Sequence, residues 1–282
     1  GAGAQHGLEP LLELVAVLLG LLVVSVSLHA LEAQEQARAN VLVVGFGVAA
    51  ACNFLHGVLV HSGPAHMPPG SADMSLWLSS WARVAEALTL GLTATRLSAP
   101  GPARAWLAAA GGVTLVLVGS ALGPLPHWFA HAADGALRQV VAVGLALALA
   151  ASAVLLYRRS RSEEAPRERL FAWAAGVFVC GEVTVGALGG HSTLGGVLSH
   201  GFRVVAYALL YQAVFDAGIR RPFARIQEAE SRLRESEGRL SLLGRNLPHS
   251  VLFQIVRELD GRVHFVHMGD AIERLNGVRV ED

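Results

Sequence analysis

Carboxylate and guanidinium groups occur inside the apolar segments of this sequence, where they are energetically costly. An ionisable group within a bilayer is unfavourable by several kcal/mol unless it is paired or faces a cavity, so each one is a candidate functional group. Counting from the ends of the predicted helices places most of them at similar depth, on different helices. We interpret them as ligand-binding residues of one polar pocket: Glu9, Glu13, Arg83, Glu86, Glu182 and Arg203.

Opposite charges within this set can neutralise one another. Arg83 and Glu86 are three residues apart, so they can pair on one helix face. Glu182 and Arg203 lie at matching depths on consecutive antiparallel helices, so they can pair across the helix interface. The alternative is a purely structural role, because buried ion pairs often fix helix packing without binding anything.

Histidines are enriched at the same predicted end of the helices. Neutral imidazole is the commonest protein ligand for zinc, copper and haem iron. We expect His6, His56, His61 and His200 to be metal ligands, with a transition-metal ion, copper or zinc, as the cofactor. Three alternatives stay open: a haem clamped between His56 and His200, a small organic ligand, and polarity that serves only the structure.

The elements that must position these side chains are long apolar helices. The 282 residues are 53% hydrophobic and 16% charged, with a mean hydropathy of +0.47, whereas soluble domains carry roughly a quarter charged residues. A bilayer-spanning helix needs about 20 mostly apolar residues. Seven segments qualify: Leu8–His29, Val41–Val60, Leu76–Leu97, Arg104–Leu122, Gly135–Tyr157, Leu170–Leu188 and Val197–Asp216. The predicted fold class is an all-α membrane protein, with a seven-helix bundle over residues 1–217.

The distribution of arginine predicts the orientation in the membrane. Arginines recur in the connections near residues 38, 96–104, 158–169 and 220–225, and the connections on the opposite side, about 61–75, 123–134 and 189–196, have none. Cytoplasmic loops collect positive charge, so we expect an inner-membrane protein with a periplasmic N-terminus and a cytoplasmic C-terminus. The polar pocket then opens toward the periplasm.

Composition also excludes several classes of protein. The 22 basic residues, all arginine, balance 22 acidic residues, so the chain has no basic stripe of the kind that binds nucleic acid. Cys52 and Cys180 both lie in apolar runs, which excludes a disulfide-stapled secreted scaffold. The lipid bilayer and a small ligand or metal ion remain as the expected partners.

A charged, helix-favouring segment over residues 218–247 follows the last apolar run. One set of residues recurs there every seven positions, and members of a second set lie three positions after members of the first. This is the a/d pattern of a parallel two-stranded coiled coil. The first set is Ile226, Leu233, Leu240 and Leu247, and the second is Ala229, Ser236 and Leu243. We therefore expect a homodimer through this coiled coil and the membrane helices; one amphipathic helix packed on its own domain is the alternative.

Residues 248–282 predict two strands and a short helix. Ser250–Glu258 and Arg262–His267 are rich in β-formers around an Asp260-Gly261 turn, and Asp270–Leu275 is predicted to be helical. The segment resembles the opening of a PAS domain, an α/β fold that needs on the order of 100 residues to close a core. We expect a partial, truncated PAS domain here, with any output enzyme beyond Asp282 and no catalytic domain within the chain.

The membrane part, about Gln5–Phe215, resembles the third MASE class of membrane-associated sensor domains. The resemblance rests on His6 and Glu13, on FLHGVLVHSGPAHM, on LWLSSWARVAEALTLGLTA and on LSHGFRVVAYALLYQAVF. The family pattern maps onto His56, Trp77 or Trp81, Arg83, Glu86, His200 and Tyr211. It implies a receptor followed by a PAS domain and an output domain in a two-component or cyclic-di-GMP signalling protein.

These observations together predict a bacterial signal-transduction receptor whose last membrane helix passes a ligand-induced change to the coiled coil. A sensor histidine kinase is the expected output, and a diguanylate cyclase is the alternative. The rival class is a metal or proton transporter, because seven helices with intramembrane charges could conduct ions. Against transport, we find no internal repeat and no polar run through the inner half of the bundle.

Overall fold

The fold was determined from a computed structural model, which divides into two compact units, Gly1–Arg221 and Pro222–Asp282. The structure describes residues 2–29, 36–61, 70–96, 101–127, 136–162, 166–188, 193–246, 253–258 and 261–268.

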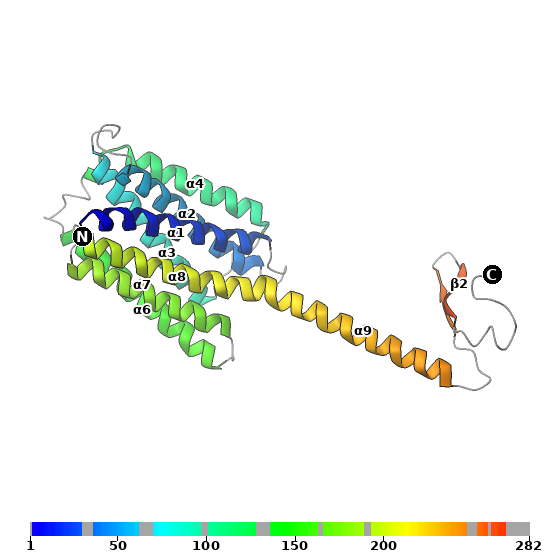
Figure 1. The fold of residues 1–282 in the computed structure, drawn as a ribbon. Helices are drawn as coiled ribbons and strands as arrows, with labels where there is room; N and C mark the ends of the chain where they lie inside the picture. The colour runs from blue at the N-terminus through cyan, green and yellow to red at the C-terminus, as the bar shows by residue number, and fades with distance from the viewer. Residues whose placement is uncertain are drawn as a thin grey trace. The chain divides into compact units, whose positions relative to one another are not determined.

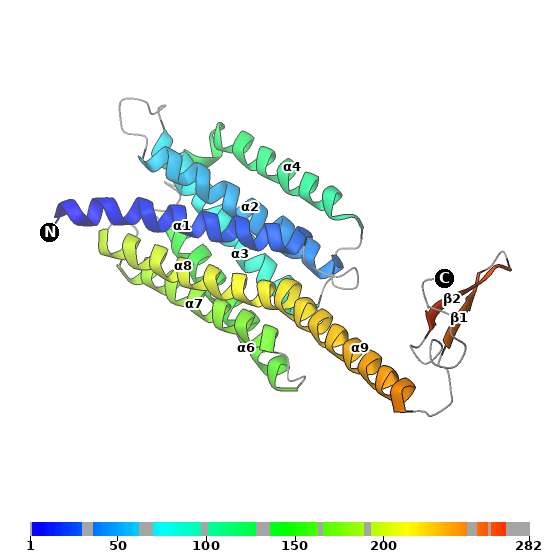
Figure 2. The same cartoon turned by 45° about the vertical axis from the view of Figure 1, so that its right-hand side comes forward.

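The first unit is a bundle of long helices that run alternately up and down (Figures 1 and 2). They are α1 (Ala2–His29), α2 (Gln36–His61), α3 (Ser71–Thr95), α4 (Ala103–Ala121), α6 (Ala136–Ser162), α7 (Pro166–Leu188) and α8 (Thr193–Phe215). Each of the seven predicted segments coincides largely with one of these helices. The chain is therefore an all-α membrane protein, as its composition predicts.

Six of the helices within the described residues are long and apolar enough to cross a membrane, and α3 is the one that is not. It carries Asp73, Arg83 and Glu86 within 25 residues, together with several serines and threonines. Its position explains this polarity, because α3 packs against α2 and also touches α4, α6 and α7. Its charged side chains can therefore face protein rather than lipid.

Close packing around α1, α2 and α8 forms the core. Tyr207 is buried between Phe46 and Phe178, with both ring pairs arranged edge to face. A Cβ added at Gly45 would collide with the Thr89 side chain, so glycine lets α2 and α3 touch there. The outward faces of the bundle carry large exposed apolar residues such as Leu115, at 74%, as expected for a surface that meets lipid.

The two ends of the bundle differ in chemistry. We call the end where α1 begins and α2 finishes the His-rich end, and the opposite end the Arg-rich end. At the Arg-rich end, Arg38 lies 3.7 Å from Glu168, and Arg159 donates to the carbonyl oxygen of Ala94. The predicted orientation would place this end in the cytoplasm.

After α8 the backbone stays helical through a five-residue π-helical turn, η3 (Asp216–Arg220), into α9 (Arg221–Asn246). Three of the predicted heptad positions on α9, Ile226, Leu233 and Leu240, are 63%, 60% and 51% exposed. The fourth, Leu247, lies outside the described residues. Three ion pairs at i, i+4 spacing support the single helix: Glu228–Arg232, Glu230–Arg234 and Glu235–Arg239.

The predicted strands form an antiparallel hairpin of β1 (Phe253–Arg257) and β2 (Val263–Met268). Gly261 adopts a φ of +89° in the turn, a conformation that favours glycine. The predicted helix Asp270–Leu275 lies outside the described residues. The part of this segment that the structure describes contains the two-stranded hairpin and no further strand or helix, so the PAS assignment stays a prediction.

Candidate functional site: two polar layers at the His-rich end

The polar side chains predicted from the sequence gather at the His-rich end in two layers. The imidazole layer lies nearer the end of the bundle and contains Glu9, Glu13, His56, His61 and His200. The arginine layer lies deeper and contains Arg83, Glu86, Glu182 and Arg203, together with Asn53 and Tyr207. Five helices contribute, namely α1, α2, α3, α7 and α8.

Glu13 is the centre of the imidazole layer. Its side chain is 6% exposed, with Oε2 3.1 Å from Nε2 of His61 and Oε1 3.6 Å from Nε2 of His56. Gly57 makes room for this carboxylate, since a Cβ at that position would lie 3.0 Å from it. The absence of a side chain at Gly57 thus lets α1 approach α2 with a charged group between them.

His56 is oriented by α3. Its Nδ1 lies 2.7 Å from Oγ of Ser75 and 3.0 Å from the Ser75 carbonyl oxygen. A carbonyl oxygen only accepts, so the second contact is a hydrogen bond when Nδ1 carries the proton. In that tautomer Nε2 presents a lone pair to Oε1 of Glu13, which has no hydrogen-bond partner among the described residues. When Glu13 is ionised, two acceptors then face each other with no donor between them.

A second imidazole–carboxylate pair joins α1 to α8. Nε2 of His200 lies 3.8 Å from Oε1 of Glu9, and the buried Nδ1 of His200 has no hydrogen-bond partner among the described residues. A Cβ at Gly196 would lie less than 3.0 Å from the Glu9 carboxylate, so this carboxylate would have to shift if α8 carried a side chain there. The imidazole layer therefore holds unsatisfied buried polar atoms on both sides of α1.

The arginine layer, in contrast, neutralises itself. Nη1 of Arg83 donates to Oε2 of Glu182 at 3.1 Å, and Nε of Arg203 lies 3.5 Å from Oε1 of Glu86. The pairing predicted from spacing is therefore wrong, because it joined Arg83 to Glu86 and Glu182 to Arg203. In the structure each arginine pairs with the other glutamate, because α3 touches α7 and this contact brings Arg83 to Glu182.

Neutral side chains complete the hydrogen bonds of the buried Glu86 carboxylate. Its Oε1 accepts from the Tyr207 hydroxyl at 2.8 Å and from Nδ2 of Asn53 at 3.4 Å. Oδ1 of Asn53 in turn accepts from Nη1 of Arg203 at 3.2 Å. Sequence reasoning missed Asn53, Tyr207 and Ser75, and the available signal was spacing: Asn53 precedes His56 by three residues and Tyr207 follows Arg203 by four.

A cavity of about 300 Å³ lies between α1 and α2 and gives access to these groups. Its polar lining consists of Glu13, Asn53 and His61, so it contacts both layers. Its apolar lining includes Leu14 and Phe54, which are 49% and 53% exposed. A small ligand could therefore reach the Glu13 carboxylate between the two helices.

The predicted metal ligands do not form a ready metal site in the part of the chain that the structure describes. Within the described residues, no group of three or more His, Cys, Asp or Glu side chains is placed to hold a metal ion, because Glu13 faces His56 and His61 with different oxygens. His6 lies on α1, but its side chain is outside the described residues. Nε2 of His56 and Nε2 of His200 approach different carboxylates, which disfavours a haem clamped between them.

The aromatic residues that the resemblance mapped lie away from these layers. Trp77 donates its indole N–H to Oγ of Ser120 on α4, and Trp81 lines a different cavity. Tyr211 lies one turn beyond Tyr207 and stacks on Phe215. Tyr207, rather than Tyr211, is thus the tyrosine of α8 that contacts the polar network.

Comparison with known proteins assigns the membrane part to a family. The family model for the MASE3 membrane-associated sensor domain matches residues 8–222, which cover α1 to η3 and more than half of the chain. No curated protein and no solved structure matches the chain. With its membrane helices and its buried polar layers, this chain belongs to the MASE3 family of membrane-associated sensor domains.

Proposed function

We propose that the chain is the sensing part of a bacterial inner-membrane receptor that binds a small cation beside Glu13, in a pocket open to the periplasm. The observation that carries this proposal is the gap between Oε1 of Glu13 and Nε2 of His56. Both atoms are acceptors in the tautomer that the Ser75 carbonyl favours, and they face each other across 3.6 Å. A cation between them would satisfy both.

Charge balance supports a cationic ligand. Within the described residues, neither Glu9 nor Glu13 lies within ion-pair distance of an arginine, whereas Glu86 and Glu182 each do. The imidazole layer therefore carries two carboxylates against neutral or titratable rings. A bound cation would lower the cost of keeping these carboxylates away from water.

A transition-metal ion, copper or zinc, is the specific candidate. Zinc bonds to imidazole nitrogen and carboxylate oxygen are about 2.0–2.2 Å long, so tetrahedral ligand atoms lie roughly 3.4 Å apart. The Glu13 contacts to His61 and His56, at 3.1 and 3.6 Å, bracket this spacing. Rotation of the Glu13 carboxylate would let one of its oxygens and both imidazole nitrogens, of His56 and His61, reach the same ion. His6 and His200 are the further ligands that the sequence offers.

Transmission would run through α8. This helix carries His200, Arg203 and Tyr207, and the backbone continues helically into α9. Asn53 contacts the ligand cavity and also binds Arg203, so a change at Glu13 can alter the packing of α8. We propose that α9 pairs with a second copy through its exposed heptad residues and passes the change to a PAS domain. The output is then a sensor histidine kinase or, alternatively, a diguanylate cyclase.

The test is metal binding by the purified chain in lipid nanodiscs. Cobalt(II), whose absorption reports tetrahedral coordination, is titrated first and is then displaced by zinc. We expect saturable binding that Glu13→Gln or His61→Ala weakens at least tenfold, while Glu228→Gln on α9 leaves it unchanged. Equal binding by Glu13→Gln and the unmodified chain would refute the site. Accumulation of cobalt inside sealed vesicles that contain the protein would instead support the rival function, a transporter.

A further inference from the structure

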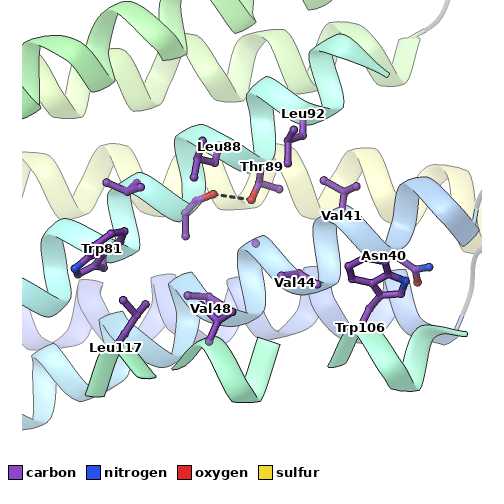
Figure 3. Close-up of a pocket in the computed structure, with 14 residues that line it drawn as sticks. Asn40, Val41, Val44, Val48, Trp81, Leu88, Thr89, Leu92, Trp106 and Leu117 are labelled. Atoms are coloured by element: carbon purple, nitrogen blue, oxygen red, sulfur yellow. Dashed lines mark hydrogen bonds between the residues drawn. The ribbon is translucent and has the colours of Figure 1, made fainter. Parts of the chain in front are cut away.

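A second cavity, of about 440 Å³, lies between α2, α3 and α4 (Figure 3). No residue of either polar layer lines it. Valines of α2, leucines of α3 and Leu117 of α4 form its walls, with Trp81 toward one end and Trp106 toward the other. Its volume falls within the range of small-molecule sites. Unlike the cavity beside Glu13, it has no ionisable side chain in its lining.

The cavity is open sideways, toward the bilayer. Leu88 and Leu92 of α3 and Val113 of α4 line it, and they are 60%, 39% and 46% exposed. α4 rests mainly on α2, and a hydrogen bond from Trp77 to Ser120 connects α3 to α4 near the His-rich end. The hydroxyl of Thr89 already has a hydrogen-bond partner, since it donates to the carbonyl oxygen of Ala85 one turn earlier on α3. An incoming group would therefore meet hydrocarbon along most of its length.

The end of the cavity beside Trp106 is rigidly built. Asn40 lines the cavity and donates to the carbonyl of Gly101 at 3.0 Å, which ties the start of α4 to α2. Gly101 has a φ of +116°, a conformation that disfavours other residues, and a Cβ there would lie 3.5 Å from the Trp106 indole nitrogen. Trp106 therefore lies beside Gly101 at this end of the cavity, where tryptophan suits a membrane interface.

Two arginines lie close in sequence to the end of the cavity beside Trp106. Arg96 ends α3 one turn beyond Leu92, and Arg104 precedes Trp106 by two residues. The sequence contains no acidic residue between Glu86 and Asp134. Basic clusters beside gaps between membrane helices are suited to anionic lipid headgroups.

From the apolar channel, its lateral opening and the basic residues near its Trp106 end, we infer that the cavity between α2, α3 and α4 binds one acyl chain of an anionic phospholipid whose headgroup contacts Arg104. Neutral lipids would fit the channel equally well but would lack the headgroup contact. This site is independent of the cation site proposed above.

Quenching of tryptophan by brominated lipid tests the inference on the full chain in nanodiscs. In a variant that keeps only Trp106, brominated phosphatidylglycerol should reach half-maximal quenching at a mole fraction about fivefold lower than brominated phosphatidylcholine, which corresponds to one arginine contact. Val113→Phe should remove this preference by filling the channel. Val116→Phe is the matched control, because Val116 is 71% exposed on the same helix and does not line the cavity.

Two further comparisons decide the outcome. Arg104→Gln should reduce the preference to less than twofold, whereas Arg158→Gln, at an exposed position near the same end of the bundle, should retain it. Native mass spectrometry of the unmodified protein should show one retained phosphatidylglycerol, which guards against misfolding of the single-tryptophan variant. Equal quenching by both lipids, equal behaviour of the two phenylalanine variants, or retention of an isoprenoid quinone in place of phospholipid would overturn the inference.

Discussion

The two polar layers are built from the same kinds of side chain, yet they are satisfied to very different degrees. In the arginine layer each carboxylate faces a guanidinium group, and Glu86 also accepts hydrogen bonds from Tyr207 and Asn53. In the imidazole layer, Oε1 of Glu13 and Nδ1 of His200 have no hydrogen-bond partner among the described residues. The two unsatisfied atoms belong to side chains that are only 6% exposed in Glu13 and 12% exposed in His200, so exposure to water does not explain the difference.

This contrast separates stability from binding. A buried network whose charges are paired fixes how helices pack, and its groups would have to give up those partners to bind a ligand. Buried polar atoms without partners are costly, and a ligand that pairs with them recovers that cost. We therefore expect mutations in the arginine layer to unfold the bundle and mutations in the imidazole layer to change binding.

The largest effect should come from breaking the Glu86–Arg203 pair. Arg203→Met leaves the Glu86 carboxylate buried without its cation, which should cost about 3–5 kcal/mol of unfolding free energy. Glu86→Leu combined with Arg203→Met should recover much of this loss, because no unpaired charge remains. Unfolding by SDS titration measures both, with Arg158→Met as an exposed control. Equal loss in the single and double variants would contradict the pairing.

A smaller loss is expected for the Arg83–Glu182 pair. The Arg83 side chain is 15% exposed, so water can partly solvate the charge left on Glu182. Arg83→Gln should therefore cost about 2 kcal/mol, at the middle of the range for a buried group that loses its partner. The same titration measures it. A loss as large as that of Arg203→Met would show that the two pairs are equally buried in the membrane.

The next effect concerns binding. Gly57→Ala places a methyl group 3.0 Å from the Glu13 carboxylate, so this side chain must shift by a few tenths of an ångström. We expect a several-fold loss of cobalt affinity without a loss of stability. Gly176→Ala is the matched control, since its added methyl group would contact nothing within 4 Å. Equal affinities of the two variants would place the ion away from Glu13.

The smallest effect should be that of Glu13→Gln on stability. The variant keeps the size of the side chain, removes a carboxylate that has no arginine partner, and retains an acceptor for His61. Its unfolding free energy should stay within about 1 kcal/mol of the unmodified chain, because removal of an uncompensated buried charge offsets the lost contact. A loss like that of Arg203→Met would mean that both layers serve stability alone.

Hydropathy and the positions of charged residues were enough to predict the helices and the residues that meet at the His-rich end. The ion pairs were not predictable, because they depend on which helices are neighbours and how each is rotated. Arg83 and Glu86 share one face of α3 but diverge, one toward α7 and the other toward α8. Asn53 was not predicted, because charge inside an apolar segment marks the other residues and an amide side chain is neutral.

The lipid-facing cavity shows a second limit of sequence reasoning. Val44, Leu88 and Leu117 look like ordinary membrane residues, and only the spacing between α3 and α4 leaves a channel among them. The coiled coil and the PAS segment illustrate the converse. Their patterns are readable in the sequence, whereas pairing depends on a second copy of the chain and closure of a core depends on more than one hairpin.

The π-helical turn between α8 and α9 has a geometric consequence for every residue that follows it. Such a turn takes up more residues than an α-helical turn, so it offsets the angular position of the downstream side chains relative to an uninterrupted α-helix. Each residue step in an α-helix turns the chain by about 100°. Tightening the ring at Asp216–Arg220 by a single hydrogen-bond step would therefore change the direction in which Ile226, Leu233 and Leu240 point, by the same angle for all three.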